Sequence, residues 1–129
     1  MILPLNHKKL EVYKISRILV KECYLLTSLL PTEEKFNLTT QIRRAALSVK
    51  LNIAEGSSRK STIERKRYYE ISRGSLIEID AAIETAFDLS YLTKEQITSL
   101  SLHLNQCFAL LSGLIKQSIS LFTFHFSLS

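Results

Sequence analysis

Basic side chains gather between residues 41 and 73 of this sequence, and phosphate binding is the chemistry that they could perform. Lys and Arg on the exposed side of a helix neutralise phosphates, and a helix N-terminus adds free N–H donors and a favourable dipole. The loop Gly56–Lys60 directly precedes one such predicted N-terminus. We therefore predict a phosphate-binding surface made of Arg43, Lys50, Arg59, Lys60, Arg65, Lys66 and Arg73.

The helix predicted for residues 39–56 has two polar flanks, which indicates two different kinds of contact. At about 100° per residue, its apolar stripe leaves Arg43 and Lys50 together on one flank. Side chains on the other flank could form a charge-assisted network that fixes a helix–helix or subunit contact. The candidates for this network are Gln41, Arg44, Asn52 and Glu55.

No set of side chains has the sequence spacing of an active site or a metal site. His7, His103 and His125 lie far apart, with no acidic residue or Cys beside them at ligand spacing. Cys23 and Cys107 are 84 positions apart, so we expect buried free thiols rather than zinc ligands or a disulfide. The sequence therefore predicts no enzyme activity, no cofactor and no metal.

The charge of the chain is uneven along its length. Residues 1–75 contain 15 Lys and Arg against 7 Asp and Glu, whereas residues 76–129 contain 2 against 5. This asymmetry is compatible with a basic surface for an anionic partner and equally with a basic face that only contacts solvent. Both interpretations stay open at this point.

Neither end of the sequence has the pattern of a targeting or membrane segment. Charged residues near the N-terminus precede any apolar stretch, so we expect no signal peptide. Residues 96–129 carry Lys116 as their only Lys, Arg, Asp or Glu, but polar side chains recur opposite the Leu positions. That pattern favours an amphipathic bundle helix over a membrane span, and a cytoplasmic protein follows as the expectation.

Apolar residues at three- and four-residue spacing predict four helices in a single domain, residues 1–129. With 3 Gly and 2 Pro, the 129-residue chain has too few turn residues for a many-stranded β fold. Ser61 with Glu64, and Thr93 with Gln96, match capping boxes that begin the last two helices. The predicted helices cover residues 7–30, 39–56, 61–90 and 93–117.

Short links between these helices predict an all-α, antiparallel up-down-up-down four-helix bundle, because each helix returns beside its predecessor. Pro31 and Gly56 are expected to end the first two helices. The core side of the third helix is predicted to contain Tyr68, Ile71, Ser75, Ile79, Ala82, Ile83 and Ala86.

The tail, residues 118–129, changes period. Phe122, Phe124 and Phe126 alternate with polar residues, which is the spacing of a β-strand. We expect a frayed tail, and the alternative is a segment that pairs with another subunit or docks on the bundle.

Three stretches of the sequence carry a resemblance to a known family. The first is LTTQIRRAALSVKLNIAEG at residues 38–56, followed by Arg59. The others are Tyr69 with RGSLIE at residues 73–78, and LSYL at residues 89–92. Together they resemble the bacterial four-helix-bundle proteins encoded in 23S rRNA intervening sequences. The resemblance implies a ring-like homopentamer related to the accessory protein of diversity-generating retroelements, which binds nucleic acid beside a reverse transcriptase.

The sequence and this resemblance predict a non-enzymatic homo-oligomer that binds RNA or DNA phosphates through basic residues without reading bases. The alternative is a structural or adaptor module that binds a protein partner. In that case the basic residues serve solubility, and the apolar tail or the fourth helix serves assembly.

Overall fold

The computed structural model contains four α-helices in its described part, which comprises residues 3, 5, 7 and 10–128, with side chains as far as residue 117. A short 3-10 helix, η2, covers Thr32–Glu34 between the first two helices. The predicted all-α class with four helices is confirmed. The helices are α1 (Glu11–Thr27), α2 (Leu38–Ser58), α3 (Thr62–Asp88) and α4 (Lys94–Leu128).

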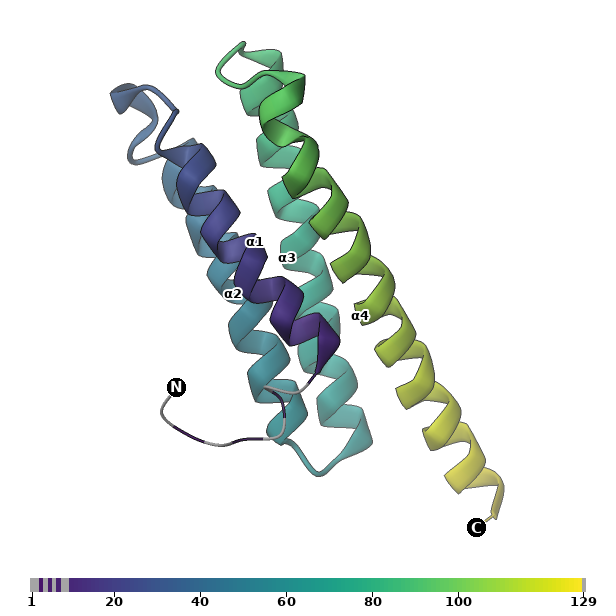
Figure 1. Cartoon of the computed structure of the whole chain (residues 1–129). Helices are drawn as coiled ribbons and strands as arrows, with labels where there is room; N and C mark the ends of the chain where they lie inside the picture. Colours follow the sequence, from purple (N-terminus) through teal and green to yellow (C-terminus); the bar gives the residue numbers. More distant parts are fainter. Residues whose placement is uncertain (1–2, 4, 6, 8–9, 129) are drawn as a thin grey trace.

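Successive helices run in opposite directions, as the colour gradient along the chain shows (Figure 1). The α2–α3 loop lies at one end of the bundle, and the α1–α2 and α3–α4 connections lie at the other (Figure 1). α1 contacts α2 and α4, and α3 contacts the same two helices, so the four helices close into a ring. The α1–α2 side of the bundle therefore lies opposite the α3–α4 side.

The core lies between the helices and is formed by aliphatic side chains from all four of them. Leu19 of α1, Ile53 of α2, Ile79 of α3 and Leu111 of α4 are fully buried. Burying one such side chain contributes about 1.5–3 kcal/mol, so this core supplies the main stabilising free energy.

α2 and α3 approach each other closely because small side chains lie between them. A Cβ added to the buried Gly56 would lie 2.9 Å from Tyr68 Cβ and 3.0 Å from a ring carbon of Tyr69. Ser72 Oγ of α3 donates to the Val49 carbonyl of α2 at 2.8 Å. The prediction that Gly56 ends the helix is wrong, because α2 continues beyond it to residue 58. The missing side chain serves helix packing instead.

The first half of α3 has a different register from the predicted one. Tyr69, Ser72 and Leu76 are buried there, whereas Ile71 is exposed and Tyr68 is half-buried. Tyr69 turns inward because its ring packs against the glycine of α2. In the second half, the predicted core positions are confirmed as buried at Ser75, Ile79, Ile83 and Ala86, with Ala82 half-buried.

The predicted capping residues begin α3 and α4. Ser61 Oγ accepts a hydrogen bond from the Glu64 N–H at 3.3 Å. Thr93 Oγ1 accepts from the Gln96 N–H at 3.2 Å, and Gln96 Oε1 accepts from the Thr93 N–H at 2.8 Å. These bonds satisfy terminal donors that have no partner within the helix, so both starts were readable from local sequence.

α1 is shorter than the predicted range 7–30, because it begins at Glu11 and ends at Thr27. Thr27 Oγ1 donates to the Cys23 carbonyl at 2.7 Å, which satisfies an acceptor in the last turn. A turn then leads to Pro31, which precedes η2 rather than directly ending α1.

α4 continues to Leu128, so the predicted helix end at residue 117 is wrong and the strand-like spacing of residues 118–128 does not set the backbone. An established helix gains one hydrogen bond for each added residue, and no Gly or Pro follows Gly113 to interrupt it. The side chains of residues 118–129, and with them the predicted docking of the tail, lie outside the described residues. Within the described part, no helix is both long and apolar enough to cross a membrane.

Both cysteines are buried and free, as predicted. Burial, with a smaller effect from the charge of Glu22, raises the pKa of the Cys23 thiol to about 12. Burial alone raises the pKa of the Cys107 thiol to about 12. Both thiols therefore stay protonated in the folded protein over the whole neutral and mildly alkaline range.

We expect these thiols to be unreactive towards a disulfide reagent at pH 8 until the protein unfolds, because the thiolate is the nucleophile. An unfolded thiol loses its proton above about pH 8.5, while the folded one keeps it. The free energy of unfolding should therefore fall as the pH rises from about 9 towards 12. Thiol titration with and without denaturant checks this, and rapid reaction of both thiols in the folded protein would contradict it.

Candidate nucleic-acid interface

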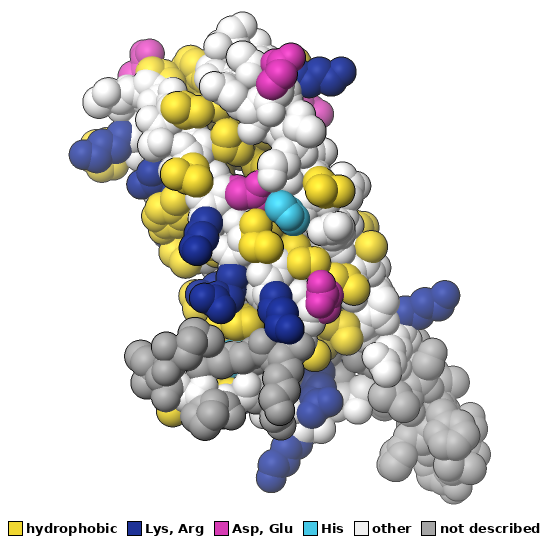
Figure 2. All heavy atoms as spheres, viewed as in Figure 1, with side chains coloured by type: hydrophobic (Ala, Val, Ile, Leu, Met, Phe, Trp, Pro, Cys, Tyr) yellow, Lys and Arg dark blue, Asp and Glu magenta, His cyan; other side chains and the backbone are white. Residues whose placement is uncertain are grey.

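Cations concentrate at the end of the bundle that holds the α2–α3 loop, which we call the basic end. Figure 2 shows Lys and Arg side chains gathered over the lower half of the face along α1. The cations of the basic end are Lys14, Arg17, Lys50, Arg59, Lys60, Arg65, Lys66 and Arg67, with the acids Glu11, Glu55, Glu64 and Glu70. The opposite end carries Glu33, Glu34, Glu84, Asp88 and Glu95 against Lys35 and Lys94.

Three exposed cations of α1 were not among the predicted phosphate contacts, and two of them, Lys14 and Arg17, belong to the basic end. Lys14, Arg17 and Lys21 share one face because three- and four-residue steps return to the same side of a helix. They line a shallow surface pocket together with Ile18. Among the described side chains, none of the three cations has an ion-pair partner. Their spacing is visible in the sequence and was the signal that could have found them.

Arg43 and Lys50 lie on the predicted flank of α2, where both contact tyrosines of α1. Arg43 Nε donates to Thr27 Oγ1 at 2.8 Å, and its guanidinium lies 4.6 Å from the centroid of the Tyr24 ring. Lys50 Nζ lies 5.9 Å from the centroid of the Tyr13 ring. Arg43 therefore joins α1 to α2, while the Lys50 ammonium keeps its donors available for a phosphate.

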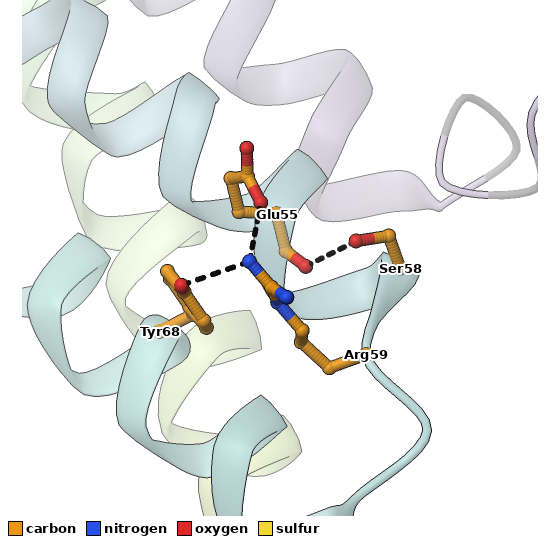
Figure 3. A network of polar contacts seen from close by, with 4 residues as sticks. All are labelled: Glu55, Ser58, Arg59 and Tyr68. Atoms are coloured by element: carbon orange, nitrogen blue, oxygen red, sulfur yellow. Dashed lines mark hydrogen bonds and ion pairs between the residues drawn. The ribbon is translucent and has the colours of Figure 1, made fainter.

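Arg59 is held by a polar network at the end of α2 (Figure 3). Its Nη2 donates to Glu55 Oε2 at 3.1 Å and to the Tyr68 hydroxyl oxygen at 3.0 Å. Its guanidinium also lies 5.0 Å from the centroid of the Tyr68 ring, and Ser58 Oγ donates to the Glu55 carbonyl at 2.7 Å. Tyr68, followed by Glu55, raises the pKa of Arg59, so this residue remains a cation. A phosphate at Arg59 would have to compete with these partners.

The other predicted cations near the α2–α3 loop differ in how freely they can meet a phosphate. Arg65 Nε donates to the Arg59 carbonyl at 2.5 Å, and Lys66 Nζ lies 3.3 Å from Glu70 Oε1. Lys60 is exposed and has no ion-pair partner among the described side chains. Lys60 is therefore the most available cation of this loop.

Arg73 lies at the contact between α3 and α4, away from the basic end. Its Nη1 donates to Ser112 Oγ at 3.2 Å, and its guanidinium lies 5.7 Å from the centroid of the Phe108 ring. Arg73 was predicted to be part of the phosphate-binding surface, but the register of α3 turns it towards α4. The structure thus separates it from the other predicted phosphate contacts.

The four residues predicted to form a network on the second flank of α2 do not form one: two of them make separate polar contacts, and the other two are exposed. Asn52 Nδ2 donates to the Ser48 carbonyl at 2.8 Å and to its Oγ at 3.1 Å, while Glu55 pairs with the guanidinium described above. Gln41 and Arg44 are exposed, without a side-chain hydrogen bond or ion pair to any described residue. Arg44 and Asn52 line the same open pocket on the outer side of α2.

A comparison with protein families identifies the relatives of this chain. The family model described as 23S rRNA-intervening sequence protein matches residues 8–113, which is most of the 129-residue chain. The chain belongs to this family. The resemblance found in the sequence is thereby confirmed, and it extends over all four helices.

A solved structure supports the same assignment for this 23S rRNA-intervening sequence family member. It is the crystal structure of a protein with unknown function from the S23 ribosomal protein family of Bacteroides thetaiotaomicron VPI-5482. The two chains are 25% identical and superpose with a TM-score of 0.75, covering 81% of this chain and 98% of the other. No curated protein matches the chain.

This family member also has a polar cluster between α1 and α4. Glu22 Oε1 lies 2.7 Å from His103 Nδ1, and Ser99 Oγ donates to Glu22 Oε2 at 2.5 Å. An ionised carboxylate only accepts hydrogen bonds, so we assign His103 Nδ1 as the donor. Among the described residues, no group of three His, Cys, Asp or Glu side chains is placed to hold a metal ion.

We expect Glu22→Ala and His103→Ala to be coupled in their effects on stability, because each removes the same partly buried hydrogen bond. The coupling free energy in a double-mutant cycle should be about 1 kcal/mol. Urea unfolding of the wild type, both single variants and the double variant measures it. Strictly additive effects would show that the contact contributes nothing.

Proposed function

We propose that this protein is a non-enzymatic, cytoplasmic homo-oligomer that binds the phosphates of RNA or DNA through its basic end. The observation that carries the proposal is the set of exposed cations Lys14, Arg17 and Lys60, without ion-pair partners among the described side chains. Lys and Arg side chains that neutralise phosphates release the counterions condensed on the nucleic acid, and this release favours binding. The resemblance to the family supports a pentamer as the oligomer.

Binding without base recognition is favoured by where the aromatic rings of the basic end lie. Bases of a single strand stack on exposed aromatic side chains. Tyr68 is covered by the Arg59 guanidinium, and Tyr69 is buried against Gly56. The cations near them can neutralise phosphates of any sequence, and they offer contact to the backbone alone.

Light scattering tests this proposal by measuring the mass of the purified protein with and without a short mixed-sequence RNA or DNA. At low salt, we expect the oligomer to gain the mass of bound nucleic acid and to lose it progressively as salt approaches physiological concentration. An oligomer that gains no mass even at low salt would rule out the nucleic-acid function.

A second candidate function, an adaptor for another protein, is favoured by apolar side chains on the outside of the bundle. Leu51 of α2 and Ile77 of α3 are each 57% exposed. A protein complex formed through such side chains should resist salt and should survive reversal of the basic-end charges. Salt-resistant binding of one purified partner, with no nucleic-acid binding, would establish the adaptor function instead.

A further inference from the structure

Helix α2 is apolar on two opposite sides, although one of them faces away from the core. Ile42, Val49 and Ile53 form the fully buried inner stripe. On the outer side, Leu47 is 38% and Leu51 is 57% exposed. A surface helix in a monomeric bundle normally has one apolar stripe, so the outer stripe indicates a further contact.

This outer surface of α2 is basic and open, and we call it the α2 face. It is lined by Leu47 and Leu51, by Tyr24 of α1, and by Arg43 and Arg44. Arg43 is engaged with Thr27, as described above, whereas Arg44 is exposed without an ion-pair partner among the described side chains. Among the described residues, no acidic side chain lines the pocket on this face.

The α3–α4 side of the bundle carries a second apolar surface with the opposite charge, which we call the α3–α4 groove. Ile77, Phe87 and Phe108 are large side chains that remain 57%, 43% and 41% exposed there. Asp80 and Glu84 line the groove between them, exposed and without an ion-pair partner among the described residues. Arg73 lies beside this groove, but its guanidinium already contacts Ser112 and the Phe108 ring. The charged groups of the groove that remain available to a partner are therefore carboxylates.

We propose that the α2 face of one copy of this chain docks into the α3–α4 groove of the next copy, head to tail. The apolar parts would bury Leu47 and Leu51 against Ile77 and Phe108. Arg44 would then lie against Asp80 and Glu84 of the neighbouring copy, which pairs charges that have no ion-pair partner among the described residues of their own chain.

The charges also disfavour the symmetric alternatives. Two α2 faces in contact would oppose arginines with arginines, and two grooves in contact would oppose carboxylates with carboxylates, and like charges in contact disfavour association. The two surfaces lie on opposite sides of the bundle, because α1–α2 and α3–α4 are opposite sides of the helix ring. A contact between two different surfaces repeats from copy to copy and closes into a ring when the rotation allows.

The inference rests on the oligomeric part of the proposed function and is tested without nucleic acid. The variants Leu51→Glu, on the α2 face, and Ile77→Glu, in the groove, each place a charge in one of the two apolar surfaces, and the two introduced carboxylates repel each other if the altered surfaces meet. Each variant alone should be a monomer by light scattering, with a dissociation constant raised by about tenfold or more. The matched control is Leu102→Glu, which places the same charge at a 56% exposed leucine of α4 outside both surfaces and should assemble like the wild type.

The deciding measurement is the mass of an equimolar mixture of the two variants. Leu51→Glu keeps an intact groove and Ile77→Glu keeps an intact α2 face, while the two altered surfaces repel each other, so the mixture should form a one-to-one dimer and nothing larger. Normal assembly of either variant alone, or a mixture that stays monomeric, would overturn the head-to-tail contact while leaving an oligomer of another kind standing. A wild type that is monomeric would overturn this inference and the oligomer together, and melting curves confirm that each variant is folded.

Discussion

The Gly56→Ala variant is expected to destabilise the protein, although alanine is normally the better helix former. The added Cβ would lie 2.9 Å from Tyr68 Cβ, an atom that no side-chain rotation can move away, and 3.0 Å from the Tyr69 ring. Overpacking of this kind costs about 1–3 kcal/mol, against a gain of about 1 kcal/mol in helix propensity. We expect a net loss of up to about 2 kcal/mol in the free energy of unfolding, measured by urea denaturation.

Gly74→Ala is the matched control for this prediction. Gly74 lies inside α3, and apart from the nearby backbone of its own helix no described atom lies within 4 Å of an added Cβ, so the same substitution meets open space. It should stabilise the protein by about 0.5–1 kcal/mol, because alanine restricts the unfolded chain and favours the helix. If both variants changed stability in the same direction, the close approach of α2 and α3 at Gly56 would be contradicted.

The double variant Lys14→Glu with Lys60→Glu is expected to lose most of its nucleic-acid binding. Both side chains are exposed at the basic end without ion-pair partners among the described residues, so reversal should leave folding intact. If each lysine contacts one phosphate of a single strand, the slope of log affinity against log salt should become shallower by about 1.4, and affinity at low salt should fall by about tenfold or more. Fluorescence anisotropy with labelled RNA measures both quantities.

The control for that variant is Lys35→Glu with Lys94→Glu, which makes the same change in net charge at the opposite end of the bundle. Both lysines are exposed. Affinity should fall much less in the control, because exposed charges act mainly within a Debye length of about 8–10 Å. Equal losses in the two double variants would mean that net charge, rather than the basic end, governs binding.

The four helices, and the starts of α3 and α4, were predictable because their determinants are local. The apolar residues of each helix recur from one turn to the next, so their spacing is visible in a short stretch of sequence. Capping pairs such as Thr93 with Gln96 satisfy backbone donors that are only a few residues away. The strand-like tail was mispredicted because its alternating period competes with an already formed helix, which propagates through it to Leu128.

The candidate site was predicted less completely because it depends on contacts between helices. Tyr68 and Tyr69 are adjacent, and only the close approach at Gly56 decides which of them turns inward. That choice sets the register of α3 and therefore carries Arg73 to the α4 side. Similarly, the partners that occupy Arg43 lie on α1, at Tyr24 and Thr27, beyond the reach of a pattern within one helix.

The central claim, that the basic end binds phosphates without reading bases, is tested most directly by measuring affinity against salt for two RNAs of unrelated sequence. The account predicts equal affinities within a few-fold and parallel linear plots, with a slope of about −0.7 for each phosphate contacted on a single strand. Binding that is independent of salt, or restricted to one of the two sequences, would contradict it.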